Sequence, residues 1–115
     1  MSLTIALLPG DGIGPEVTAE AVRILKNVAD HAGKPFTFST HLIGGAALDA
    51  DGVGLPERTL EACLGANAVL LGAVGHPKFD GRRPQERPEA AILALRQALG
   101  GFANLRPSVC YPALA

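Results

Sequence analysis

The sequence predicts an α/β fold built on a parallel sheet. Short, continuous apolar runs at 3–8 and 68–74 have the length of strands that are buried on both faces. Longer segments with helical spacing of apolar side chains lie between and after these runs. Strands that alternate with helices of ten or more residues are typical of a doubly wound α/β sheet.

The chain opens with the expected strand at 3–8, a glycine-rich turn and a helix that begins near Pro15. Proline suits a first helical turn, where a missing N–H has no effect. The apolar residues that follow fit a period of 3.6 and form one stripe of a helix, and Gly33 is expected to end it. The stripe comprises Val17, Ala21, Ile24, Leu25, Val28 and Ala32.

The middle of the chain contains shorter elements. Phe36 and Phe38 alternate with polar residues, which predicts a half-buried strand over 36–43 that ends at two glycines. The next expected elements are a helical turn at 46–50, a helix from 55 to about 64 and a buried strand at 68–74.

The last part of the chain is expected to contain a long charged loop, a helix and a further strand. The loop at 75–88 holds three prolines, the helix covers 89–99, and the apolar strand at 102–110 is interrupted by Arg106 and a proline. A strand at 102–110 would need neighbours, yet only Tyr111–Ala115 follow it. We therefore expect a fragment of a longer protein.

Composition narrows the classes of function. Apolar residues make up 48% of the 115 residues, which favours a buried core, and 10 basic against 11 acidic residues give a net charge of −1. This balance gives no electrostatic footprint for nucleic acid or an anionic membrane. No apolar run reaches the roughly 20 residues of a membrane span, and no signal peptide is recognisable. We expect a cytoplasmic protein whose partners are small molecules or copies of itself, with free thiols at Cys63 and Cys110.

The turn Gly10-Asp11-Gly12-Ile13-Gly14 lies between a strand and a helix, where phosphates often bind. A dinucleotide-binding turn of the Rossmann type would have its third glycine one residue later and an acidic residue after the next strand. Pro15 and Glu16 also disfavour a phosphate here. A tight turn that needs glycine for its backbone, or a loop that touches a cofactor without holding its phosphates, remain as alternatives.

Two arginines are candidates for binding an anion. Arg96 lies four residues after Ile92 on one helix face, which suits a ligand with a carboxylate and an aliphatic arm. Spacing alone favours the alternative, a solvent-facing Arg96 beside a core stripe of Ile92, Leu95 and Leu99. Arg106 lies in an apolar segment, where an unpaired charge is costly, and its planar guanidinium can bind a carboxylate through two hydrogen bonds. The loop at 75–88 follows the carboxyl end of a strand and is long, which favours function over a solvated surface.

Six motifs resemble the β-decarboxylating dehydrogenases, the family of isocitrate and isopropylmalate dehydrogenases, and most closely the isopropylmalate branch. Their order and spacing cover essentially the whole chain. The motifs are LPGDGIGPEV at 8–17, GGAALD at 44–49, AVLLG at 68–72, GHPKFDG at 75–81, RPE at 87–89 with LALR at 93–96, and FANLRP at 102–107.

The resemblance implies a three-layer α/β/α fold of the isopropylmalate dehydrogenase type, not a Rossmann fold, of which 1–115 would be the N-terminal part of the first of two domains. It implies oxidation of (2R,3S)-3-isopropylmalate by NAD and loss of CO₂, giving 4-methyl-2-oxopentanoate in leucine biosynthesis. Mg²⁺ or Mn²⁺ would hold the carbonyl and stabilise the enolate. A homodimer is also implied. The metal ligands and the catalytic tyrosine and lysine would lie beyond residue 115, so the fragment alone is expected to be unstable and inactive.

By the same resemblance, two groups of residues would form the sites present here. Arg96 and Arg106 would bind the malate carboxylates, and Ile92 with Leu93 would contact the isopropyl arm. The NAD site would be lined by Ile13 from the glycine turn and by the residues from His76 to Glu89. In order, these are His76, Pro77, Lys78, Phe79, Asp80, Gly81, Arg82, Arg83, Pro84, Gln85, Glu86, Arg87, Pro88 and Glu89.

Departures and alternatives remain. The family usually has Gly-Gly-Pro-Lys-Trp where this chain has Gly75-His76-Pro77-Lys78-Phe79, so His76 adds bulk and a titratable group, with a catalytic His76 as a further option. A dehydrogenase for another malate-core acid, such as tartrate or isocitrate, is one alternative; an aliphatic residue at position 92 favours the isopropyl substrate. A small non-catalytic carboxylate-binding domain is the other.

Overall fold

The structure is a computed structural model that describes residues 2–115. Three parallel strands form one sheet in the order β2-β1-β3, so the first strand lies in the centre. The strands are β1 (Leu3–Gly10), β2 (Phe36–Thr40) and β3 (Ala68–Ala73). The predicted strands at 3–8 and 68–74 are confirmed, and the one expected over 36–43 ends earlier, at Thr40.

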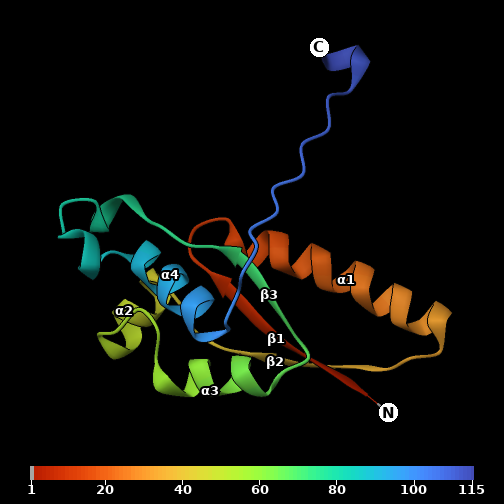
Figure 1. The fold of residues 1–115 in the computed structure, drawn as a ribbon, viewed down its shortest axis with the longest axis horizontal. Coiled ribbons are helices and arrows are strands. Elements are labelled where there is room, and N and C mark those ends of the chain that lie inside the picture. Colours follow the sequence, from red (N-terminus) through yellow and green to blue (C-terminus); the bar gives the residue numbers. More distant parts are fainter. Residues whose placement is uncertain (1) are drawn as a thin grey trace.

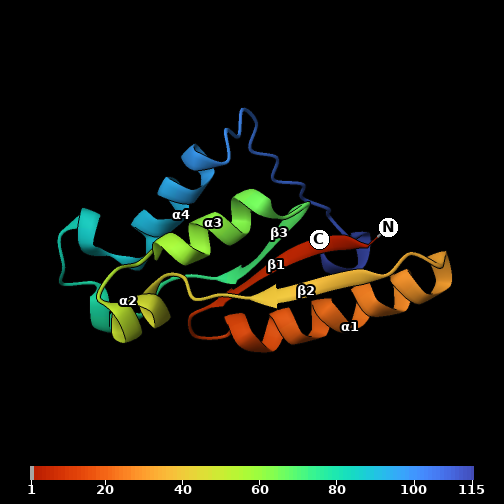
Figure 2. The same cartoon turned by 90° about the horizontal axis from the view of Figure 1, so that it is seen from below.

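Helices cover both faces of this sheet, which gives the predicted α/β/α layers. Figure 2 shows α1 (Gly14–Ala32) on one face, and α3 (Glu57–Gly65) and α4 (Pro88–Ala98) on the other. The short helix α2 (Gly45–Asp51) lies at one end of the sheet, beyond the carboxyl ends of the strands (Figure 1). The four predicted helical segments are therefore confirmed, with ends that differ by at most two residues.

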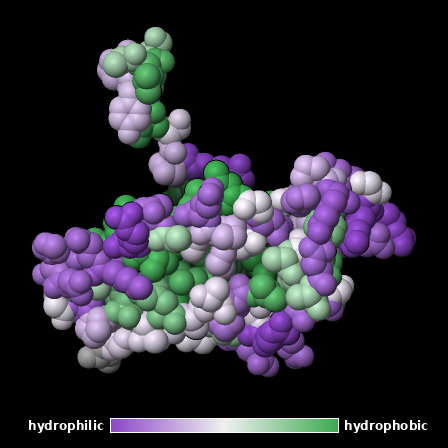
Figure 3. Space-filling view, turned by 180° about the vertical axis from the view of Figure 1, so that it is seen from behind, coloured by the Kyte–Doolittle hydropathy of each residue, from purple (hydrophilic) through white to green (hydrophobic). Residues whose placement is uncertain are grey.

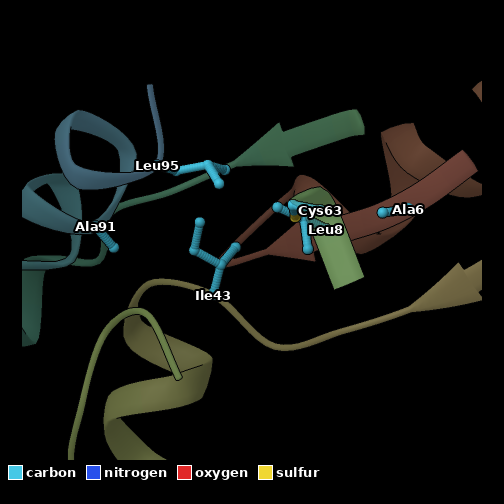
Figure 4. Close-up of a cluster of buried hydrophobic side chains, with 6 residues drawn as sticks. All are labelled: Ala6, Leu8, Ile43, Cys63, Ala91 and Leu95. Atoms are coloured by element: carbon cyan, nitrogen blue, oxygen red, sulfur yellow. The ribbon is translucent and has the colours of Figure 1, made fainter. Parts of the chain in front are cut away.

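The core lies between the sheet and the pair α3 and α4. Strand β1 is buried on both faces, from Ile5 to Leu8, as its continuous apolar sequence predicts. Figure 4 shows a cluster of buried hydrophobic side chains, in which residues from β1, the segment after β2, and both helices meet. Its members are Ala6, Leu8, Ile43, Cys63, Ala91 and Leu95.

Helix α1 packs on the sheet through small side chains instead of its apolar stripe. Thr18 and Ala29 are buried, whereas Val17, Ile24 and Val28 are 45%, 66% and 51% exposed. A side chain at Gly72 of β3 would come within 2.5 Å of Thr18 Oγ1, so the helix and strand are in close contact here. The apolar stripe predicted from the sequence is therefore rotated partly away from the sheet.

The prediction of a strand over 102–110 is wrong. The segment has an extended, irregular backbone and runs away from the body of the molecule (Figure 1), and Phe102 is fully exposed. A strand needs a neighbour for its backbone hydrogen bonds, and none of the described strands pairs with this segment. Pro107 also lacks a donor N–H. A one-turn helix, Pro112–Leu114, follows.

Candidate functional site

The carboxyl ends of the three strands meet at one edge of the sheet. The glycine-rich turn follows β1, Gly44 and Gly45 come shortly after β2, and Gly75 comes two residues after β3. In open parallel sheets ligands bind outside this edge. The turn, the start of α2 and the loop at 75–88 are thus brought together, as the loop's position in the sequence predicts.

Asp11 joins these three segments through its carboxylate. The N–H groups of Gly45 and Gly75 donate to Oδ2 at 2.7 and 2.9 Å, and the N–H of Ala46 donates to Oδ1 at 2.7 Å. The backbone N–H of Asp11 donates to Ala73 O at 2.7 Å. Asp11 is 8% exposed, so the buried carboxylate has its charge matched by three donors.

Glycine is required where these segments approach one another. Gly10 and Gly12 have φ of 76° and 55°, which confirms the reading of the turn as one that needs glycine for its backbone. At Gly75, φ is 130°, and a Cβ would lie 2.8 Å from Glu89 Oε1. A Cβ at Gly45 would lie 2.6 Å from the ring of Phe79. The first residues of the loop therefore lie directly against α2 and α4.

The loop is folded around Phe79. This ring is 3% exposed and lies edge-on to His76, with Lys78 Nζ and Arg82 Cζ at 5.0 and 4.8 Å from its centre. His76 Nδ1 accepts a hydrogen bond from the N–H of Lys78 at 3.2 Å, which caps a 3-10 turn at Pro77–Phe79. Lys78 also pairs with Asp49 of α2 at 2.6 Å.

The second half of the loop is held by Arg87. Its Nε donates to Arg82 O at 2.9 Å and its Nη2 to Asp80 O at 2.8 Å. Arg83 pairs with Glu86 at 3.0 Å beside a second 3-10 turn, Pro84–Glu86. The loop predicted to lack structure thus has two turns of its own. Of its residues and the first residues of α4, Phe79 and Pro88 are buried.

A hollow of about 300 Å³ opens between the glycine turn, α2 and the first half of the loop. It brings together three residues predicted for the NAD site, His76, Lys78 and Phe79. Ile13 lies in the same turn as two lining glycines and is 62% exposed. The remaining lining residues are Gly10, Asp11, Gly12, Gly45, Ala46 and Asp49.

The residues predicted to bind substrate lie elsewhere. Arg96 is exposed in the last turn of α4 and lines a hollow of about 310 Å³ with Phe102 and its neighbours. Ile92 is half-buried and Leu93 is 65% exposed. Arg106 is exposed in the extended segment, so the burial expected for it is not present. Arg106 is not among the residues that line the hollow beside Arg96.

Sequence reasoning missed Asp11 and Asp49 as parts of this site. The available signal was an aspartate between two glycines immediately after a buried strand, a place where a short carboxylate can accept backbone N–H groups. Among residues 2–115, no group of three or more His, Cys, Asp or Glu side chains is placed to hold a metal ion. No described helix is long and apolar enough to cross a membrane.

Curated proteins are similar to this chain in sequence. The 3-isopropylmalate dehydrogenase of Moorella thermoacetica is 57% identical over 111 residues, which are 96% of this chain and 31% of the relative. That of Nitratidesulfovibrio vulgaris is 53% identical over 115 residues, which are 100% of this chain and 32% of the relative. The chain thus spans about a third of the length of these curated relatives.

Solved structures of dehydrogenases are similar to this fold. A β-decarboxylating dehydrogenase from Thermococcus kodakarensis has a TM-score of 0.64 at 37% identity, over 85% of this chain and 27% of that one. Isocitrate dehydrogenase from Methylococcus capsulatus has a TM-score of 0.67 at 31% identity, over 85% and 26%. A family model described as Isocitrate/isopropylmalate dehydrogenase matches residues 4–115. The chain therefore belongs to the isocitrate/isopropylmalate dehydrogenase family.

Proposed function

We propose that this chain is the N-terminal part of the first domain of a two-domain, NAD-dependent 3-isopropylmalate dehydrogenase that acts as a cytoplasmic homodimer in leucine biosynthesis. The observation that carries the proposal is the identity of 53–57% to curated 3-isopropylmalate dehydrogenases, against 31% to the isocitrate dehydrogenase structure. Ile92 is expected to contact the side arm of the substrate, and its aliphatic side chain also supports 3-isopropylmalate as that substrate.

The hollow at the strand ends supports a role in holding NAD, which when bound would accept hydride from C2 of the substrate as the C2 hydroxyl loses its proton and becomes a carbonyl. Lys78 in its lining is paired with Asp49, so this cation is not free for a phosphate, and the hollow suits a neutral, polar part of the cofactor. The backbone at Gly12 is open, since nothing lies within 4 Å of a Cβ built there. His76 and Lys78 offer hydrogen-bonding groups to a ribose or an amide.

The two arginines support a role in binding the substrate's carboxylates. Neither Arg96 nor Arg106 forms an ion pair with another side chain among residues 2–115, so both guanidinium groups are available. Ile92 shares a face of α4 with Arg96 and would contact the isopropyl arm, with Leu93 beside it. No group of three or more His, Cys, Asp or Glu side chains among residues 2–115 is placed to hold the proposed Mg²⁺ or Mn²⁺, so its ligands would come from the rest of the two-domain enzyme.

The proposal can be tested in a chimaera in which residues 1–115 replace the matching part of the Moorella thermoacetica enzyme. We expect the chimaera to restore growth of a leucine auxotroph without leucine, because the joined chain would complete the sites. A matched chimaera with Arg96→Ala should fail, and one with Arg23→Ala, at an exposed arginine of α1, should succeed. A soluble, folded chimaera that does not restore growth would contradict the proposal.

A further inference from the structure

We propose that Asp11 is a positioning residue for the NAD site. Its carboxylate holds Gly75, the first residue of the loop at 75–88, and the start of α2 around the hollow described above. The inference rests on the proposed function for the identity of the ligand. The hydrogen bonds that Asp11 accepts do not depend on the identity of the ligand.

The tie is made by three hydrogen bonds to one buried side chain. Gly45 and Gly75 donate to Oδ2 and Ala46 donates to Oδ1, at 2.7 to 2.9 Å. Bonds to an ionised acceptor are about twice as strong as neutral ones. Removal of the carboxylate would leave three backbone donors, in two segments far apart in sequence, without their acceptor.

The space around position 11 fits an aspartate better than a glutamate or an asparagine. A Cβ built at Gly44 would lie 2.8 Å from Asp11 Oδ2, and one at Gly45 would lie 3.0 Å from it, so the carboxylate lies close to both glycines, which have no side chain to displace it. A glutamate would be one methylene too long for this space. An asparagine would keep one acceptor oxygen and turn its amide toward a backbone N–H, which removes part of the tie.

The Asp11 carboxylate holds residues that line the hollow. Gly45 and Ala46 line it directly, and Gly75 immediately precedes His76, which also lines it. The other polar tie between α2 and the loop is the ion pair of Lys78 with Asp49, whose side chains are 49% and 56% exposed. Exposed ion pairs contribute little rigidity, so Asp11 is the main polar link that sets the position of the loop.

The experiment compares Asp11→Ala, Asp11→Asn and Asp30→Asn in the chimaera; Asp30 is an exposed acid of α1, distant in sequence from the loop. Deuterium uptake is followed for peptides that contain residues 44–50 and 74–83, and KM is measured for NAD and for 3-isopropylmalate. With Asp11→Ala we expect faster uptake in both peptides and a KM for NAD raised about tenfold, a loss of about 1.4 kcal/mol of binding. The KM for 3-isopropylmalate should stay within about twofold.

Asp11→Asn should give intermediate values for both measurements, and Asp30→Asn should match the unaltered chimaera. Equal rises in the two KM values, or unchanged deuterium uptake in both peptides, would overturn the inference. If Asp11→Ala does not fold, Asp11→Asn decides in the same way. An unaltered chimaera that lacks activity would contradict the proposed function alone, because deuterium uptake still reports on the tie.

Discussion

At the scale of single residues, Asp11 accepts hydrogen bonds from backbone groups of two distant segments, whereas Arg96 is exposed in the last turn of α4. The sequence pointed to Arg96 and to the 75–89 segment because charged residues follow a strand or share a helix face with an aliphatic one. It did not point to Asp11, whose partners at Gly45 and Gly75 are 34 and 64 residues away. Such long-range hydrogen bonds depend on the register of three strands, which no local pattern contains.

Arg96→Lys in the chimaera should raise the KM for 3-isopropylmalate about 10- to 100-fold and leave the KM for NAD unchanged. A lysine keeps the charge and loses the second parallel hydrogen bond to a carboxylate, worth about 1.5–3 kcal/mol. Arg23→Lys is the matched control, on the exposed face of α1. Steady-state kinetics check the prediction, and a KM that does not change would remove Arg96 from the substrate site.

The two cysteines should differ in reactivity. Burial raises the pKa of the Cys63 thiol above its usual value of 9.0, whereas Cys110 is exposed. In a thiol-labelling time course of the chimaera, we expect the buried Cys63 thiol to react slowly, so that Cys63→Ser leaves any fast phase intact. A raised pKa in the folded state also means that Cys63 contributes stability below pH 9 that is lost at higher pH. A fast phase that disappears with Cys63→Ser would contradict this burial.

At the scale of elements, continuous apolar runs predicted the strands β1 and β3, and an apolar stripe with a period of 3.6 predicted α1. Two further predictions, the buried face of α1 and the strand over 102–110, depended on neighbouring elements that a local sequence pattern does not specify. The stripe of α1 is rotated outward because Thr18 and Gly72 allow a closer approach than its larger apolar residues would. The segment at 102–110 has a strand-like composition but no described strand beside it, so it remains unpaired.

The close contact of α1 with β3 can be tested with two glycines. Gly72→Ala should destabilise the chimaera by at least about 2 kcal/mol, because its Cβ would collide with Pro9 O and Thr18 Oγ1. Gly65→Ala, at the end of α3 with open space around it, should stabilise by about 0.4–1 kcal/mol. Urea unfolding measures both. Equal effects would show that α1 does not pack against Gly72 as described.

At the scale of the whole molecule, the radius of gyration of 15.6 Å exceeds the roughly 13 Å of a compact domain of about this size. The extended C-terminal segment accounts for this, and Figure 3 shows it standing clear of the body with apolar atoms uncovered. Phe102, Leu105 and Leu114 are more than 80% exposed, and β2 and β3 are both edge strands in the described sheet. So much uncovered apolar surface is unfavourable for an isolated domain.

The chain of 115 residues, expressed alone, should therefore bind a hydrophobic dye and melt without a sharp transition. The chimaera should bind little dye and melt cooperatively, because the added chain can cover the exposed apolar side chains. Dye fluorescence and circular dichroism on heating check this. A cooperative transition of the isolated chain would contradict it, and would show that the three-stranded sheet with its helices is sufficient for folding.

The central claim, that this chain is part of an NAD-dependent 3-isopropylmalate dehydrogenase, is tested most directly by NADH formation in the chimaera with competing substrates. We expect kcat/KM for 3-isopropylmalate to exceed that for isocitrate and for tartrate by at least about tenfold, since Ile92 favours an aliphatic arm over a charged or hydroxylated one. A higher kcat/KM for isocitrate or tartrate, or a folded chimaera that forms no NADH from any of the three acids, would contradict the claim.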